Sequence, residues 1–350
     1  MSLENRVCLL DCTLRDGGQG IEIAAKKGYD RTFSQTERTR MTELLEKSNI
    51  EYIEVGVVKN SIDDLHKYSI YKSIEDVSNS IPQKTVKSSE YAAMFVGPDT
   101  PYGDLPEYKE GMCECIRVML RYSELKKSLD FCKVLSKKGY KVFVQPTVTA
   151  RFTNDDLNLV LDAANDINAH AVYFVDSYGF FNSDDIKQYF ELFDKKLNKG
   201  IKVGFHAHNN LSLALPNAME LLNIESERKI IIDSCLLGMG QGAGNLQTEL
   251  ISIYLNENYG KEYDYCAILD ACELIDKFSD EMLRGNSLKT TIPAVCKVAY
   301  QNSYELRDNL KFSYSDIYRI LSDIPDEILE IKYRFTQNDL KKLIEYFRTK

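Results

Sequence analysis

Two histidines separated by a single residue are the strongest candidates for chemistry in this chain. His206 and His208 end an apolar run that begins at Val203, and they are two of only four histidines among 350 residues. Residues two apart on a β-strand point to the same face, so both imidazoles would be directed the same way. Paired imidazoles at the end of a strand form a natural metal clamp. The structural alternative is a pair of hydrogen-bonded histidines, which an isolated His-x-His pattern does not exclude.

A charged pair follows a second apolar run, the one that begins at Val7. Arg15 and Asp16 precede two glycines. We assign Asp16 to the metal and Arg15 to an oxyanion that develops during the reaction, with a salt-bridged strand end as the structural alternative. One carboxylate and two imidazoles with room for water suit Mn²⁺ or Mg²⁺, with Co²⁺ and Zn²⁺ as alternatives. Such an ion is a Lewis acid that polarises a carbonyl group and stabilises an enolate.

Two further polar residues, Glu54 and Asn245, are unusual for the stretches in which they occur. Glu54 lies inside the apolar run 52–58, where a carboxylate is costly unless it is paired. We expect it to orient Arg15 or a metal-bound water, or else to pair structurally with a barrel Arg or Lys. Asn245 ends the glycine-rich stretch 238–245 and is a candidate fourth metal ligand through its side-chain oxygen. A phosphate-binding role of this stretch stays open.

Eight short apolar runs alternate with amphipathic stretches long enough for helices. Strands that are apolar on both faces and alternate with helices indicate a parallel sheet covered by helices. Eight such units in about 250 residues predict a (β/α)8 TIM barrel, with an open doubly wound sheet as the alternative. Asn154 and Ser183 are the expected N-caps of two helices. The predicted strands are Val7–Cys12, Tyr52–Val58, Ala92–Val96, Ile116–Leu120, Lys141–Gln145, Ala171–Asp176, Val203–His206 and Ile230–Cys235.

The pattern changes after residue 260, where helical stretches alternate with polar linkers. The clearest helices are Asp264–Phe278, Ile317–Leu321 and Gln337–Phe347. We therefore predict a catalytic barrel over residues 1–260 and a helical extension over residues 261–350, packed on the barrel. In a TIM barrel the catalytic groups sit at the carboxyl ends of the strands, which is where the unusual polar residues of this chain collect.

The bulk properties exclude several classes of function. A formal net charge of −9 argues against an electrostatic nucleic-acid surface. The sequence has no run of about 20 apolar residues, and its start lacks the apolar core of a secretory signal. Nine scattered cysteines, an odd number, fit reduced thiols better than a disulfide framework. We expect a cytoplasmic protein with no nucleic-acid or membrane partner.

Four motifs in order resemble the DRE-TIM metallolyase superfamily. They are the segment around Arg15-Asp16-Gly, Ile-Glu54-Val-Gly, His206-Ala-His208-Asn-Asn-Leu-Ser-Leu, and the glycine stretch that ends at Asn245. The resemblance spans roughly residues 7–250. It implies a barrel with Asp16, His206 and His208 as metal ligands, Asn245 as a fourth ligand and Arg15 at the enolate.

The resemblance is nearest to 4-hydroxy-2-oxovalerate aldolase-like and hydroxymethylglutaryl-CoA lyase-like proteins, with the aldolase branch preferred. In the aldolases a histidine three residues after the motif aspartate is implicated as the base, and here that residue is Gln19, which cannot take up a proton. Glu22 lies nearby. Tyr300 is a candidate catalytic residue by analogy with a family tyrosine, and Gln19 and Ser177 are assigned to substrate binding.

The predicted function is a metal-dependent lyase that cleaves or forms a carbon–carbon bond of a 4-hydroxy-2-oxoacid through a pyruvate enolate. One alternative is a Claisen-type acyltransferase that joins an acyl-CoA to a 2-oxoacid, as isopropylmalate synthase does. Another is a metal-binding barrel without catalytic activity. The substrate partner is a small 2-oxoacid, and the C-terminal helices are candidates for contacting a second copy or a partner enzyme.

Overall fold

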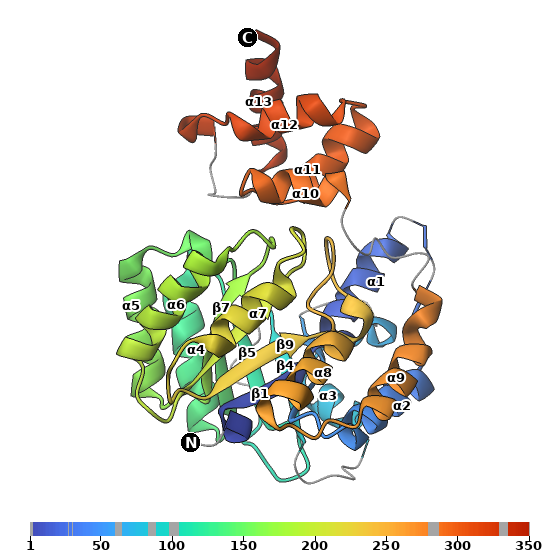
Figure 1. The fold of residues 1–350 in the computed structure, drawn as a ribbon, viewed down its shortest axis with the longest axis vertical. Coiled ribbons are helices and arrows are strands. Elements are labelled where there is room, and N and C mark those ends of the chain that lie inside the picture. Colours follow the sequence, from blue (N-terminus) through green and yellow to red (C-terminus); the bar gives the residue numbers. More distant parts are fainter. Residues whose placement is uncertain are drawn as a thin grey trace.

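Eight parallel strands close into a barrel in the computed structural model (Figure 1). The model describes residues 3–26, 28–29, 31–59, 65–82, 89–97, 105–278, 287–328 and 335–349. Strand β1 pairs with β2 on one side and with β9 on the other, which closes the ring. The predicted TIM barrel is therefore confirmed. Its strands are β1 (Val7–Asp11), β2 (Tyr52–Val58), β4 (Glu90–Phe95), β5 (Cys115–Leu120), β6 (Lys141–Pro146), β7 (Ala171–Asp176), β8 (Lys202–Ala207) and β9 (Ile230–Ser234).

Helices surround the barrel because each strand is buried on both faces. Within the barrel strands the side chains are buried with few exceptions, so the outer face needs an apolar cover. A two-residue strand, β3 (Ile70–Tyr71), extends the sheet beside β2. The covering helices are α1 (Gly18–Ala25), α2 (Gln35–Lys47), α3 (Ile74–Ser80), α4 (Leu125–Lys137), α5 (Asn154–Asp166), α6 (Ser183–Lys196), α7 (Ala214–Asn223), α8 (Thr248–Tyr259) and α9 (Tyr265–Ile275).

The two expected N-caps were each placed one residue too late. Thr153 caps α5 through a reciprocal hydrogen-bonded pair with Asp156, and Asn182 caps α6 in the same way with Asp185. Asn154 and Ser183 are instead the first residues of their helices. In both cases the residue whose side chain reaches the third helical amide is the true cap, and the acidic residue three positions later identifies it.

The C-terminal helices build a second apolar cluster at the mouth of the barrel (Figure 1). Helix α9 still packs on α2, and its buried side chains belong to the apolar cluster of the barrel. The second cluster includes Ile292, Leu306, Ile317 and Leu343. The predicted division at residue 260 stays a prediction. The remaining helices are α10 (Leu288–Val295), α11 (Gln301–Tyr304), α12 (Tyr314–Ser322) and α13 (Gln337–Thr349).

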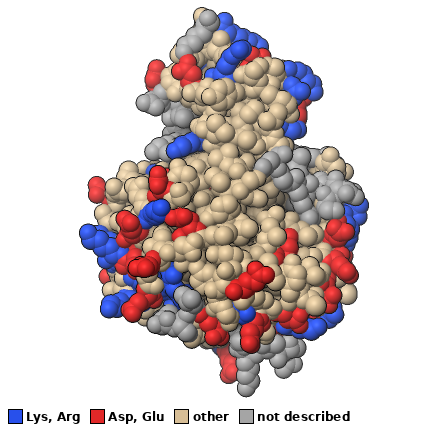
Figure 2. Space-filling model, in the orientation of Figure 1, with Lys and Arg blue, Asp and Glu red and all other residues tan. Residues whose placement is uncertain are grey.

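Among the described helices none is long and apolar enough to cross a membrane. On the face drawn in Figure 2, basic and acidic side chains of the described residues are interspersed over the barrel. That distribution is consistent with the net negative charge and does not form a basic stripe on this face.

The interior of the barrel contains a fully buried arginine between two carboxylates. Arg117 on β5 donates from Nη1 to Glu54 Oε2 at 2.8 Å and from Nη2 to Asp233 Oδ2, and none of these three side chains is exposed. The guanidinium also lies 4.9 Å from the centre of the Tyr173 ring. A buried carboxylate is tolerated only with such a partner, so Arg117 lets β2 and β9 each place a carboxylate inside the barrel.

Arg117→Met should lower the free energy of unfolding by about 3–5 kcal/mol, because it leaves two carboxylates buried without their cation. The matched control is Arg319→Met, which removes a cation from the exposed pair with Asp316 on α12 and should change stability by at most about 1 kcal/mol. Urea denaturation followed by circular dichroism gives both values. An unchanged denaturation midpoint for the Arg117 variant would contradict this role.

Candidate metal centre

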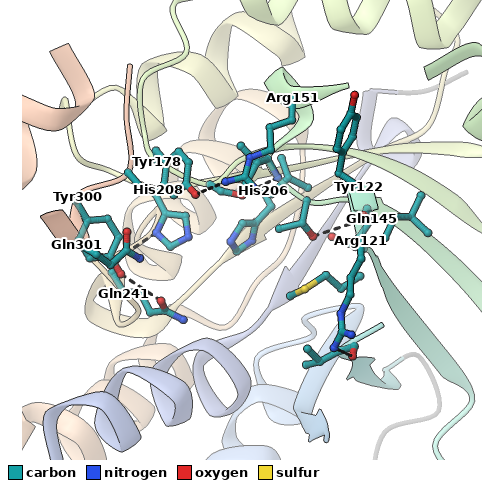
Figure 3. Close-up of a pocket in the computed structure, with 18 of the residues that line it drawn as sticks. Arg121, Tyr122, Gln145, Arg151, Tyr178, His206, His208, Gln241, Tyr300 and Gln301 are labelled. Carbon is teal, nitrogen blue, oxygen red and sulfur yellow. Dashed lines mark hydrogen bonds between the residues drawn. The ribbon is translucent and has the colours of Figure 1, made fainter. Parts of the chain in front are cut away.

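Three predicted ligands converge at the carboxyl ends of two distant strands. Asp16 lies in the turn after β1, His206 is on β8 and His208 follows that strand. Asp16 Oδ2 is 3.8 Å from His206 Nε2 and 4.0 Å from His208 Nε2. The two imidazole centroids are 5.3 Å apart, and Figure 3 shows the rings side by side. Ligand atoms of these three residues are close enough to share one ion.

The second nitrogen of each imidazole is occupied, which leaves both Nε2 atoms for a metal. His206 Nδ1 hydrogen bonds with Asp233 Oδ2 at 2.9 Å, and His208 Nδ1 with the Gln241 carbonyl oxygen at 3.2 Å. Acceptors at Nδ1 hold the proton there and direct the Nε2 lone pair elsewhere, the usual arrangement for metal-binding histidines. The donor set of one carboxylate and two Nε2 atoms therefore fits a divalent cation.

The charge states of these groups also suit a cation. Burial would raise the pKa of the Asp16 carboxyl, but Arg15 and the two histidines lower it to about 2. Burial lowers the pKa of His208 to about 4, so this ring is neutral at pH 7. Burial would also lower the pKa of His206, but hydrogen bonds with Asp233 and Cys12 raise it to about 10. A metal must displace that proton, so binding should strengthen as the pH rises.

A second group of potential ligands overlaps the first. Cys12, His206 and Asp233 also bring ligand atoms within range of one another. Asp233 is already bound to Arg117, whose positive charge opposes a second cation at that carboxylate. Asp16 and both histidines line the large cavity at the barrel mouth, whereas Cys12 and Asp233 are not among its lining residues. The Asp16 group is therefore the site that a substrate can reach.

Asn245 lies against Asp16 but presents its nitrogen. Its Nδ2 donates to Asp16 Oδ2 at 2.5 Å and to the Met239 carbonyl oxygen at 2.8 Å. Its Oδ1 is buried and has no hydrogen-bond partner among the described residues. In this orientation the Asn245 side-chain nitrogen holds the Asp16 carboxylate in place, and the Asn245 side-chain oxygen stays available to a ligand. Its role as a ligand remains a prediction.

The glycines of the loop that follows β9 allow this close approach. Gly240 has φ of +146°, and a Cβ there would lie 2.1 Å from Asn245 Nδ2 and 3.1 Å from Asp16 Oδ2. Gly244 has φ of +87°, and its Cβ would lie 2.1 Å from the Gly238 carbonyl oxygen. The glycine stretch that was conspicuous in the sequence is thus required by packing around Asn245 and Asp16.

Arg15 is fixed beside the metal ligands by Glu54. Arg15 Nε donates to Glu54 Oε2 at 2.7 Å, and Arg15 Nη1 lies 3.0 Å from Asp16 Oδ1. Glu54 is fully buried and is not among the residues that line the cavity. Glu54 also accepts from Arg117, so the expected orientation of Arg15 and the alternative structural pairing with a barrel arginine are both compatible with its contacts, and its role stays a prediction. The Arg15 guanidinium itself lines the cavity, where it can stabilise an oxyanion.

The cavity has a volume of about 1150 Å³ and lies between the barrel and the C-terminal helices. Three other predicted site residues line it. Gln19 Oε1 is 3.5 Å from Arg15 Nη1, Ser177 Oγ accepts from the Val148 amide at 3.0 Å, and Tyr300 donates to Gln241 Oε1 at 3.1 Å (Figure 3). Their assigned roles stay predictions. Described lining residues from beyond the barrel are Ala299, Tyr300, Gln301, Asn302, Glu305, Phe335 and Gln337.

Glu22 does not take the place of the base that Gln19 lacks. Its Oε1 lies 2.9 Å from Lys26 Nζ and 3.9 Å from Lys59 Nζ, and it is not among the lining residues of the cavity.

Sequence reasoning also missed Arg117, Asp233 and the pair Arg151 and Tyr178. Arg117 and Asp233 carried the same signal as Glu54, a charge inside an apolar strand, and were overlooked because their partners lie on other strands.

Residues 118–275 match the family model HMGL-like. The chain is 24% identical over 275 residues to an oxaloacetate decarboxylase of Mycobacterium tuberculosis, an alignment that covers 79% of this chain and 76% of the relative. It is 26% identical over 270 residues to a 4-hydroxy-2-oxovalerate aldolase of Thermomicrobium roseum, covering 76% and 71%.

The barrel fold is shared with a solved structure. The N-terminal domain of a provisionally assigned aldolase from Bacteroides vulgatus superposes with a TM-score of 0.73 at 22% identity. The alignment covers 89% of this chain and 99% of that domain. At this identity the similarity establishes the fold alone, and the chemistry must be argued from the residues of this chain.

His206→Ala should abolish metal retention with the fold intact, because it removes one of three converging ligand atoms. His66→Ala is the control, since His66 packs against the Tyr71 ring and belongs to neither group of potential ligands. Metal content after gel filtration is measured by mass spectrometry, and folding by circular dichroism. Full occupancy in the His206 variant would show that the ligand assignment is wrong.

Gly240→Ala should weaken metal binding by about 10- to 100-fold, because the new methyl group displaces Asn245 and Asp16 from their observed positions. Gly260→Ala is a matched control: Gly260 also has a positive φ, of +67°, but a Cβ there meets nothing within 4 Å. Isothermal titration with Mn²⁺ compares the two. Equal affinities would mean that crowding at Gly240 has no bearing on the site.

Proposed function

We propose that the protein is a divalent-metal-dependent carbon–carbon lyase that cleaves a 4-hydroxy-2-oxoacid, or forms it in reverse, through the enolate of a 2-oxoacid. The observation that carries this proposal is the convergence of Asp16, His206 and His208 beside the Arg15 guanidinium, all open to one cavity. A bound Mn²⁺ or Mg²⁺ would polarise the 2-oxo group as a Lewis acid.

The residues of the chain then account for binding and for charge stabilisation. Arg15, held by Glu54 on one side, directs its guanidinium to the place where the enolate oxygen gains charge. Gln19 and Ser177 line the same cavity and are proposed to hold the carboxylate and oxo groups of the substrate. Tyr300 is a half-buried phenol that supplies a hydrogen-bond donor at the wall formed by the C-terminal helices. Two relatives, an aldolase and a decarboxylase by name, both break carbon–carbon bonds.

Decarboxylation of a 2-oxo dicarboxylic acid is a second candidate, and Gln19 favours it. Retro-aldol cleavage needs a base for the 4-hydroxyl proton, whereas loss of CO₂ leaves the same enolate without removing any proton. Gln19 stands where a histidine base would be expected and cannot accept a proton. The Claisen-type reaction stays an alternative that is distinguished by release of free thiol from an acyl-CoA.

The test incubates the manganese-loaded protein with a panel of 4-hydroxy-2-oxoacids, with oxaloacetate, and with acyl-CoA plus 2-oxoacid pairs. Pyruvate and free thiol are measured in parallel. We expect pyruvate release from a 4-hydroxy-2-oxoacid, abolished by chelation of the metal. Arg15→Ala should lower this rate by about 10²- to 10³-fold, because it removes a donor to the developing oxyanion.

Lys26→Ala is the control for loss of a cation near α1, since Lys26 pairs with Glu22 outside the cavity. Thiol release without pyruvate release would overturn the lyase proposal in favour of the acyltransferase. Metal binding with no turnover of any substrate would favour a barrel without catalytic activity.

A further inference from the structure

The proposed cleavage needs a group that accepts the proton of the 4-hydroxyl. Among the described residues that line the cavity, Asp16 and the two histidines are engaged at the metal centre. The remaining ionisable oxygens of the described lining are the carboxylate of Glu305 and the phenols of three tyrosines, at positions 122, 178 and 300. The surroundings of these groups differ, and the difference selects one of them.

Tyr178 is the phenol that a cation contacts directly. It lies two residues after the end of β7, and β7 is the strand that pairs with β8, which carries His206. Tyr178 is largely buried and lines the cavity. Arg151 Nη2 donates to Tyr178 Oη at 2.9 Å, and the guanidinium carbon lies 5.9 Å from the centre of the ring (Figure 3). A permanently charged donor at a phenol oxygen stabilises negative charge on that oxygen.

The loops that carry Arg151 and Tyr178 are bound to each other. The Val148 amide donates to Ser177 Oγ at 3.0 Å, and the Val175 amide donates to Thr149 Oγ1 at 2.7 Å. Val148 has φ of +55°, an unfavourable backbone conformation for a β-branched residue. Such strain persists only where the surrounding structure enforces it, and it is common at functional sites. The contact between Arg151 and Tyr178 is therefore part of a fixed arrangement.

Tyr300 has the opposite surroundings. Burial raises its pKa. Its hydroxyl is also used as a donor to Gln241. A buried phenol whose hydroxyl already donates keeps its proton, whereas one beside a guanidinium gives it up more readily. Two like groups with contrasting surroundings in one site indicate which is the acid and which the base.

Glu305 and Tyr122 are weaker candidates. Glu305 belongs to the C-terminal helices, and Asn309 donates to its Oε2 at 2.6 Å in an exposed position. Tyr122 is 45% exposed at the mouth of the cavity. Neither has a bound cation that would favour proton uptake among the contacts described for it.

We infer that Tyr178, whose hydroxyl oxygen accepts a hydrogen bond from Arg151, is the catalytic proton acceptor for the 4-hydroxyl group of the substrate, in the role that Gln19 cannot fill. This inference rests on the proposed function. In the step, the phenolate oxygen takes the hydroxyl proton, the electron pair of that O–H bond forms the aldehyde C=O, and the C3–C4 bond breaks to leave the enolate. Solvent protonates C3 of the enolate, and the Tyr178 phenol returns its proton to solvent. Arg151 is a positioning residue.

The decisive experiment compares two reactions that share the metal, Arg15 and the enolate but differ in the need for a base. Tyr178→Phe is assayed for pyruvate release from 4-hydroxy-2-oxovalerate and from oxaloacetate, which loses CO₂ without giving up a proton. We expect the first rate to fall by about 10²- to 10⁴-fold, the range of general base catalysis. The second rate should keep its wild-type value.

Binding of oxalate, a mimic of the enolate, is measured by calorimetry as a readout that is independent of turnover and should be unchanged in the variant. Arg151→Met should lower cleavage in the same selective way, by a smaller factor. Tyr318→Phe removes a hydroxyl from an exposed tyrosine on α12 and serves as the matched control, with both rates unchanged.

Three results would overturn the inference. Cleavage at the wild-type rate in Tyr178→Phe would exclude this phenol as the base. An equal loss of both reactions together with oxalate binding would assign Tyr178 a structural role. If Glu305→Gln lost cleavage selectively and Tyr178→Phe did not, the Glu305 carboxylate would be the base. Failure of the proposed function is recognised separately, because the wild-type protein would then release no pyruvate from 4-hydroxy-2-oxovalerate at all, and the inference would fall with it.

Discussion

A line of alternating charges crosses the interior of the barrel, and the candidate metal centre depends on its two ends. Glu54 accepts hydrogen bonds from Arg15 and from Arg117, and Arg117 in turn binds Asp233. At one end Arg15 contacts Asp16, and at the other Asp233 holds the Nδ1 side of His206. Any one of these charges alone would cost several kcal/mol to bury, so each is stable only because its neighbour is present.

These contacts position the side chains of the candidate site without any substrate present. Asp16 comes from the turn after β1, Glu54 from β2, Arg117 from β5 and Asp233 from β9, so four segments of the barrel fix one another through their charges. A preorganised guanidinium in a buried site stabilises an oxyanion better than a mobile one in water. The C-terminal helices lie at the mouth and contribute Tyr300 to the lining of the cavity.

Much of the fold was readable from the sequence, because its signals are local. The eight apolar runs coincide with the eight barrel strands to within two residues at their ends. Potential ligand atoms of Asp16, His206 and His208 lie close together, and their role as metal ligands stays a prediction. The exceptions have physical reasons. β3 is two residues long and too short for a periodic signal. The N-caps at Thr153 and Asn182 differ from the expected positions by one residue, because neighbouring polar residues compete for the same role.

The remaining parts of the site depend on contacts between distant segments. Arg117 and Asp233 were visible as charges in apolar strands, but their pairing follows only from the register of the closed barrel. The orientation of the Asn245 amide is set by Asp16 and Met239, which no spacing in the sequence reveals. The contact of Arg151 with Tyr178 joins two separate loops in the same way.

The proposed chemistry depends on one divalent ion held by two imidazole nitrogens and the Asp16 carboxylate. Pulsed electron paramagnetic resonance of the protein with one equivalent of Mn²⁺ detects this arrangement, because nitrogen nuclei bound to the ion modulate the spin echo. We expect couplings from two imidazole nitrogens. Echo modulation without any directly bound nitrogen would contradict this arrangement, since the ion would then lie away from His206 and His208.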